Sequence, residues 1–158
     1  MKKIRKIQRG IGIFLKAGTI LSTLSFIITT LIQIYGRFFM AKAPSWTEEA
    51  ARLFFVFAIA FSSGLAMKGN FYVYFDFIFQ KFSGKWQDLI LKVTYICIIL
   101  LFTVFSVYGL LLVGSGWQEQ SPSMKFPMGI AFISMPLLGL SITLYAIVKM
   151  IMIFKTKK

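Results

Sequence analysis

Four long apolar runs restrict how this chain can fold more than any other feature. They cover about residues 11–39, 46–68, 86–114 and 128–154, and charged residues are rare within them. Each is long enough for a membrane-crossing α-helix, which needs about 20 apolar residues. A helix also satisfies its own backbone hydrogen bonds in lipid, where no water can do so. The sequence therefore predicts an all-α membrane protein, a single integral membrane domain with four transmembrane helices.

The composition supports burial in lipid. Of 158 residues, 58% are apolar and 15% are charged, whereas an ordinary soluble domain has about 25% charged residues. A small soluble domain buries only part of its surface and could not hide so much apolar area. Lipid is therefore the expected solvent for most of this chain.

The first apolar run follows a basic segment, as in a signal peptide, and Ala41-Lys42-Ala43 resembles a cleavage site. The apolar region of a signal peptide has only about 7–15 residues, and residues 11–39 are far longer. We therefore interpret residues 11–39 as a retained first helix.

The net charge of +13 is placed as the positive-inside rule requires. With four spans, both chain ends and the connection 68–85 share one side, and that side holds most of the Lys and Arg residues. We expect both termini to be cytoplasmic. Basic residues of a nucleic-acid binder lie on a soluble face instead, so no nucleic-acid partner is expected.

Residues 70–82 are predicted to form an amphipathic arm helix between the second and third spans. The segment is too short to cross a bilayer, and an aromatic-rich amphipathic helix lies in the interface plane. The alternation within residues 71–77 also permits a strand, but an open strand edge leaves backbone groups unpaired in lipid. The expected membrane-interface residues of the arm are Phe71, Phe75, Asp76, Phe79 and Phe82.

A polar cluster marks the predicted start of the second helix. Ser45 followed by Glu48 is a capping-box pattern, and Glu48 precedes Arg52 by four residues, which favours an ion pair. Glu49 lies with Glu48 at the positive end of the helix dipole. Capping with interface anchoring and contact with a partner are both open readings of this cluster. Its candidate contact residues are Arg37, Trp46, Glu48, Glu49 and Arg52.

The residues needed for catalysis or metal binding are scarce. Without histidine, the chain lacks the commonest general base and metal ligand. Its single cysteine, Cys97, can form neither an internal disulfide nor a zinc cluster. The acidic residues lie at helix ends or in connections, whereas ionisable groups inside the membrane mark transport paths. We expect no catalytic residue, metal site or cofactor, and we do not expect an enzyme.

Other residues are predicted to position the helices. Small side chains at Ser62, Ser63 and Gly64 would let helices pack closely. Trp86 and Trp117, like Trp46, lie at predicted helix ends, where tryptophan anchors a span at the interface. Pro136 predicts a kink in the fourth span.

Several motifs together resemble the small membrane subunit of TRAP transporters, the DctQ-like family. The segment 68–82 resembles the arm helix of that family. The other matching motifs are Arg37-Phe38-Phe39, Trp46-Thr47-Glu48-Glu49-Ala50-Ala51-Arg52, Gly64, Ala66, the loop Gln120-Ser121-Pro122, Pro127 and Pro136.

The resemblance implies a scaffold subunit in the bacterial inner membrane. TRAP transporters are sodium-coupled importers that use a periplasmic substrate-binding protein, and a separate large membrane subunit would hold the substrate and sodium sites. Typical cargoes are carboxylates such as C4-dicarboxylates and sialic acid, and the sialic acid type also occurs with a separate small subunit. By the same resemblance, Gln120, Ser121 and Pro122 would face the binding protein, and Ser62, Ser63 and Gly64 would pack against the large subunit.

Three other functions stay open at this point. An autonomous small transporter or channel would give flux when reconstituted alone. A membrane enzyme would contain a residue whose loss abolishes turnover. A holin-like or purely structural protein would need no large partner.

Overall fold

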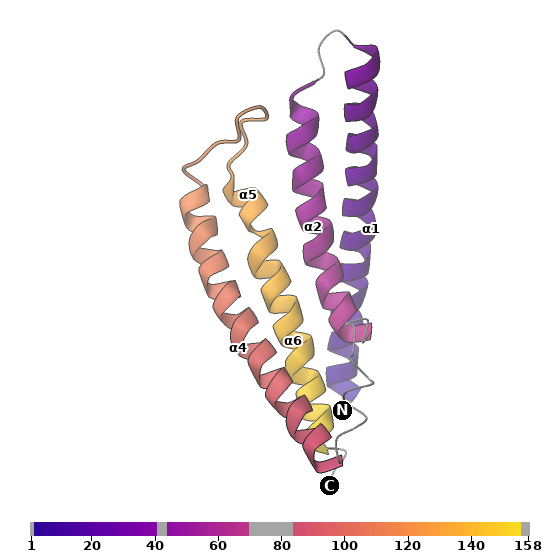
Figure 1. Cartoon of the computed structure of the whole chain (residues 1–158), viewed down its shortest axis with the longest axis vertical. Coiled ribbons are helices and arrows are strands. Elements are labelled where there is room, and N and C mark those ends of the chain that lie inside the picture. The colour runs from indigo at the N-terminus through magenta and orange to yellow at the C-terminus, as the bar shows by residue number, and fades with distance from the viewer. Residues whose placement is uncertain (1, 41–43, 70–83, 156–158) are drawn as a thin grey trace.

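The computed structural model describes residues 2–40, 44–69 and 84–155, shown in Figure 1. Within these residues the chain has four helices long and apolar enough to cross a membrane. The elements are α1 (Lys2–Phe39), α2 (Trp46–Gly69), α4 (Gly84–Gly116), α5 (Gly129–Phe132) and α6 (Ser134–Lys155). The short α5 and the longer α6 together make the fourth span, Gly129–Ile153.

The predicted arm helix over residues 70–82 lies outside the described residues. Its expected interface residues are therefore also outside them, namely Phe71, Phe75, Asp76, Phe79 and Phe82. The arm stays a prediction.

The first helix begins earlier than its apolar run. Helix α1 starts at Lys2 and has 38 residues, which at about 1.5 Å per residue makes it roughly 57 Å long. The hydrocarbon core of a bilayer is only about 30 Å thick. Lysine and arginine are good helix formers, so the basic segment before residue 11 extends the helix beyond the part that lipid can cover.

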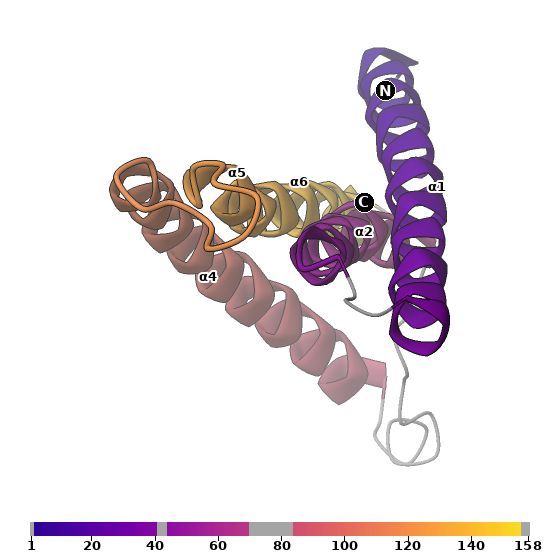
Figure 2. The same cartoon turned by 90° about the horizontal axis from the view of Figure 1, so that it is seen from above.

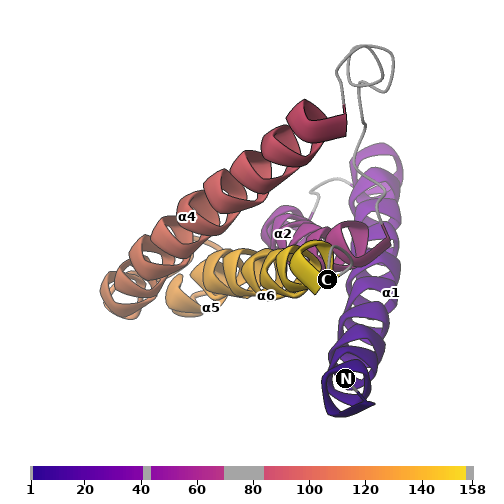
Figure 3. The same cartoon turned by 90° about the horizontal axis from the view of Figure 1, so that it is seen from below.

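The helices form two pairs joined through α6. Helix α1 packs along α2, α4 packs along α6, and α6 also packs against α2. Figures 2 and 3 show α6 between α4 and α2, with α1 on the far side of α2. Both chain ends lie at one end of the bundle, here called the terminal end, and residues 117–128 lie at the other, the loop end (Figure 1). Helices α2 and α6, one from each pair, lie close together at the terminal end and diverge toward the loop end (Figure 1), whereas the terminal ends of α1 and α4 lie on opposite sides of α6 (Figures 2 and 3).

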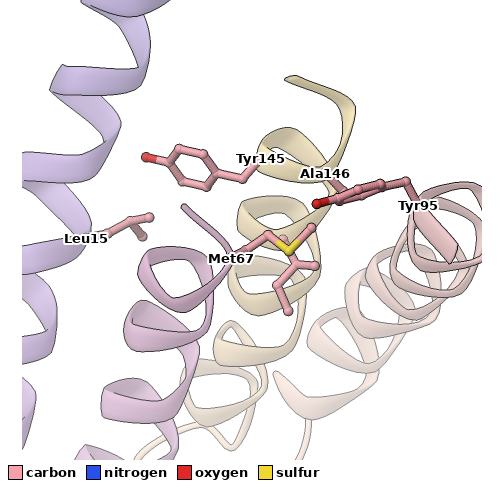
Figure 4. Close-up of a cluster of buried hydrophobic side chains, with 6 residues drawn as sticks. Leu15, Met67, Tyr95, Tyr145 and Ala146 are labelled. Carbon is pink, nitrogen blue, oxygen red and sulfur yellow. The ribbon is translucent and has the colours of Figure 1, made fainter. Parts of the chain in front are cut away.

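The buried core lies where the pairs converge, and every span contributes to it. Tyr145 also donates a hydrogen bond from its hydroxyl to the Gln8 carbonyl at 3.2 Å, which ties α6 to α1. The core residues are Leu15, Met67, Tyr95, Ile142, Tyr145 and Ala146 (Figure 4). The four helices are therefore held together mainly in the half of the bundle nearer the termini.

Gly64 allows three helices to approach one another. A Cβ atom at this buried position would lie 2.7 Å from Ser141 Cβ and 2.9 Å from Leu15 Cδ1. Gly64 therefore packs α2 against α6 and α1 within this chain, which is a different use from the predicted contact with a second subunit. Its neighbours Ser62 and Ser63 are half-buried and donate to carbonyls of their own helix, at 3.1 and 2.9 Å.

The fourth span is irregular just before Pro136. Proline lacks the N–H that would bond the carbonyl four residues earlier, and its ring crowds that carbonyl. Helix α5 accordingly ends at Phe132, and Ile133 separates it from α6. Because Ile133 keeps right-handed helical angles (φ −55°, ψ −27°), the chain continues in a helical path across this point.

Much of the apolar surface is not covered by the chain itself. Leu21 on α1 and Leu101 on α4 expose 69% and 64% of their surface. Of the most apolar part of each span, between 11% and 39% is buried inside the bundle. Such faces are expected where lipid or neighbouring membrane helices surround the protein, and they indicate a multi-pass membrane protein.

Candidate functional site

Two segments that lie far apart in the sequence meet at the loop end. Glu49, in the first turn of α2, extends its carboxylate to residues 121–124. It accepts hydrogen bonds from the Ser121 hydroxyl, from the Ser123 backbone N–H at 2.8 Å and from the Met124 backbone N–H at 2.9 Å. We call this set of residues the Glu49 clasp.

The loop is folded so that it can offer these donors. Gln120 and Pro127 form an antiparallel bridge that closes the loop. Inside it, Lys125 N–H donates to the Ser121 carbonyl at 3.0 Å, which completes a single helical turn. Pro122 opens that turn, a position where proline is favoured because the N–H it lacks would have no helical partner.

Two of the three donors of the clasp, the backbone N–H groups of Ser123 and Met124, belong to the start of this turn. The first N–H groups of a helical turn have no partner inside the turn and bind anions readily. Glu49 supplies the anion from another helix, so it caps a turn that lies more than seventy residues away in sequence. Hydrogen bonds to an ionised acceptor are stronger than neutral ones. The clasp therefore joins α2 to the connection between α4 and α5.

The adjacent Glu48 makes a different contact. Its Oε1 lies 3.2 Å from Arg52 Nη2, which is the ion pair predicted from their spacing, and both side chains are mostly exposed. At the same helix start, the buried Thr47 hydroxyl donates to the Pro44 carbonyl at 2.7 Å. Among the described residues these two bonds take the place of the predicted capping box, because Glu48 reaches forward to Arg52 instead of back to Ser45.

A cavity of about 450 Å³ opens beside the clasp, where the two helix pairs diverge. Ligand pockets commonly have volumes of about 300–1,000 Å³. The mouth of this cavity is polar and includes Glu48, Glu49, Arg52 and Ser121. Its deeper wall is mostly apolar and is formed by Leu53, Val56, Phe126, Met128, Phe132 and Met135. Ser134 also lines this wall, and its hydroxyl donates to the Ala131 carbonyl at 2.7 Å.

The structure brings together only part of the predicted contact set. Glu48, Glu49, Arg52, Ser121 and Pro122 all line the cavity. Three other predicted residues are exposed and do not line it, namely Arg37, Trp46 and Gln120. The predicted interface anchors are exposed at opposite ends of α4, with Trp86 at 59% and Trp117 at 54%.

Some residues of the site could not be assigned from the sequence. Ser123 and Met124 take part through their backbone N–H groups, which any residue other than proline provides. The pattern Ser121-Pro122-Ser123 does indicate the start of a helical turn. Nothing in that pattern specifies which carboxylate will cap the turn.

Among the described residues, no group of three or more His, Cys, Asp or Glu side chains is placed to hold a metal ion. Cys97 is exposed on α4 and lies outside both the clasp and the cavity. The polar groups of the site instead fasten helix ends together and present charge at the loop end.

A protein-family model matches most of the chain. The model described as "Tripartite ATP-independent periplasmic transporters, DctQ component" matches residues 26–156. That range includes the whole of α2, α4, α5 and α6 and the connection between α4 and α5, and therefore every residue of the clasp and the cavity. No curated protein matches the chain.

Proposed function

Because the chain belongs to the family of DctQ components of tripartite ATP-independent periplasmic transporters, we propose that it is a fixed scaffold beside a large transport subunit. The family is a transporter component and not an enzyme. Membership also implies a large membrane subunit and a substrate-binding protein as partners. As a scaffold, this chain would hold the large subunit in place and help the substrate-binding protein to dock.

The Glu49 clasp is the observation that carries the scaffold proposal. Outside the core near the termini, the helix pairs diverge, so the loop end needs its own fastening. The clasp supplies it by fixing residues 121–124 to the start of α2. A surface held in this way suits docking of a second protein, because little order has to be created on binding.

The scaffold has two kinds of contact surface. At the loop end, Arg37, Trp46, Gln120 and Pro122 are exposed and would meet the substrate-binding protein. Within the bilayer, the half-buried Ser62 and Ser63 would pack against the large subunit, which would be a separate chain. Gly64 would support this surface from inside the bundle.

The charge distribution also fits a subunit that leaves transport to its partner. Glu48, Glu49 and Glu119 lie at the loop end, and Asp88 lies near the start of α4. A protein that moves ions by itself usually carries ionisable groups near the bilayer centre. The cargo would be a carboxylate, of the sialic acid or C4-dicarboxylate type, and sodium coupling would reside in the large subunit.

Placement in the bacterial inner membrane would set the loop end in the periplasm. Both termini and the arm helix over residues 70–82 would then face the cytoplasm, as the excess of basic residues on that side favours.

The proposal is tested by recovering the tagged chain from gently solubilised host membranes and identifying the proteins that come with it. We expect a much larger multi-span protein in a near one-to-one ratio. Recovery of the chain alone in two different detergents would argue against a scaffold. In that case reconstitution of the pure chain, with flux as the readout, would test the alternative of an autonomous small transporter or channel.

A further inference from the structure

We propose that the loop-end cavity binds one phospholipid whose headgroup carries both an ammonium group and a phosphate, as phosphatidylethanolamine does. The ammonium would lie at Glu48, the phosphate at Arg52 and one acyl chain against the apolar wall. This inference goes beyond the scaffold proposal and does not depend on it, since it concerns what the cavity holds in the bilayer.

The depth of the cavity matches that of a lipid. Its mouth lies at the start of α2, next to Trp46, and Trp117, which directly follows α4, marks the same end of the bundle. Tryptophan side chains concentrate at the headgroup level of a bilayer. The polar mouth therefore lies among headgroups, and the apolar wall lies level with acyl chains.

The cavity runs from a polar mouth to an apolar wall that can contact one acyl chain. Along α2 the whole lining, from Glu48 at the mouth to Val56 at the apolar wall, spans roughly 12 Å at about 1.5 Å per residue. Opposite these residues lie Phe132 and Met135, from α5 and α6. Methionine, which is flexible and unbranched, adapts well to an irregular apolar ligand.

The charges at the mouth select the headgroup. Glu49 already accepts the bonds of the clasp, so Glu48 and Arg52 are the groups left to meet a ligand. An exposed pair four residues apart on a helix contributes little to stability, so its members can turn to other partners. Arginine matches phosphate through paired N–H donors, and Glu48 can accept from an ammonium.

The sign of the charge disfavours an anionic lipid. Two carboxylates and one guanidinium line the mouth, which leaves a net negative charge there. A headgroup with only a phosphate would offer a partner to Arg52 but none to Glu48. A headgroup that also carries an ammonium offers an opposite charge to both Glu48 and Arg52, while Glu49 stays in the clasp.

The test measures lipid binding to the full-length chain, together with any subunit that co-purifies, by native mass spectrometry. Delipidated protein is titrated with palmitoyl-oleoyl phosphatidylethanolamine and, separately, with phosphatidylglycerol of the same tails. We expect one tightly held phosphatidylethanolamine per chain, with a Kd about tenfold lower than that for phosphatidylglycerol. Equal Kd values, or tighter binding of phosphatidylglycerol, would overturn the proposal.

Variants locate the bound lipid. Ala131→Phe places a ring in the cavity, and Arg52→Gln removes the phosphate contact from an exposed position where folding is not at risk. Each should raise the Kd for phosphatidylethanolamine about tenfold. Leu101→Phe, on the exposed face of α4, is the matched control and should leave the Kd unchanged. If Arg52→Gln and Ala131→Phe bind as the wild type does, the lipid is held elsewhere and the proposal is wrong.

A protein segment could occupy the cavity instead. In that case Ala131→Phe would reduce recovery of a co-purifying subunit, and no lipid adduct would be detected while that subunit is bound. This combination would also overturn the proposal.

Discussion

At the scale of single residues, the two adjacent acids at the start of α2 have separate roles. Neighbouring residues on a helix point in different directions, so Glu48 meets Arg52 while Glu49 reaches the loop.

Lys125, on the same loop, has a backbone conformation that a residue with a side chain disfavours. Lys125 has φ 55°, in the left-handed region, where it ends the turn that the clasp caps.

Glu49→Gln should loosen the loop end. The amide keeps the shape of the side chain but removes the charge that strengthens three hydrogen bonds. We expect a lower midpoint of thermal unfolding in detergent and poorer recovery of the large partner. Glu119→Gln, which changes a loop-end carboxylate outside the clasp, should leave both unchanged. Equal behaviour of the two variants would mean that the clasp does not stabilise the loop end.

Lys125→Gly should stabilise the protein. A left-handed conformation costs an ordinary residue about 1–2 kcal/mol, and glycine would remove this cost. Glycine also makes the unfolded chain more flexible, which offsets part of the gain in stability. The expected net gain in the free energy of unfolding is about 0.5–1 kcal/mol. Lys125→Ala removes the side chain without relieving the backbone and should show no such gain in the same thermal unfolding assay. A gain as large in Lys125→Ala would assign the effect to the lost charge.

At the scale of helices, close packing depends on small residues at crossing points. Gly64 lets α2 pack closely against α6 and α1. Pro136 lies in the fourth span, which packs against both α4 and α2 and is interrupted between α5 and α6. These features shape the bundle so that its helices converge at the terminal end and leave the cavity at the loop end. Within the small-residue segment 62–64, Gly64 is buried between helices, whereas Ser62 and Ser63 are half-buried and reach the outer surface of the bundle.

Gly64→Leu should destabilise the bundle. Its side chain would overlap Ser141 and Leu15, and overpacking of this kind costs about 1–3 kcal/mol. Gly114→Leu is the matched control, because a Cβ atom at Gly114 meets nothing within 4 Å. Thermal unfolding of both variants in one detergent compares them directly. A loss of stability no larger for Gly64→Leu than for Gly114→Leu would show that the three helices are not closely packed at Gly64.

At the scale of the whole molecule, both chain ends lie at the terminal end, opposite residues 117–128 (Figure 1). Many large apolar side chains of the membrane-spanning helices are exposed, as expected for a protein surrounded by lipid and neighbouring membrane helices. Its orientation across the bilayer decides which partner can reach the clasp and the cavity.

The topology can be checked with single cysteines in a Cys97→Ser background. A membrane-impermeant maleimide should label Gln118→Cys in cells whose outer membrane alone is permeabilised. It should label Gln8→Cys only after the inner membrane is broken, because we expect the basic N-terminal segment to be cytoplasmic. The reverse pattern would place the clasp in the cytoplasm and exclude a role in docking a periplasmic protein.

The sequence alone determined the features that depend on local spacing or on segment length. Four spans follow from apolar runs that need about 20 residues each, and the pair Glu48–Arg52 follows from the spacing of one helical turn. The most specific part of the family resemblance was the segment from Arg37 to Arg52, and the family match covers that segment.

The tertiary structure alone decided which distant segments meet. Glu49 and the turn after Ser121 are more than seventy residues apart, and no periodicity relates them. Gly64 was identified from the sequence as a packing residue, but only the crossing of α2 with α6 and α1 shows what it packs against. The cavity likewise exists because two helix pairs diverge. Local sequence sets the conformation of each segment, whereas these features depend on how the helices cross.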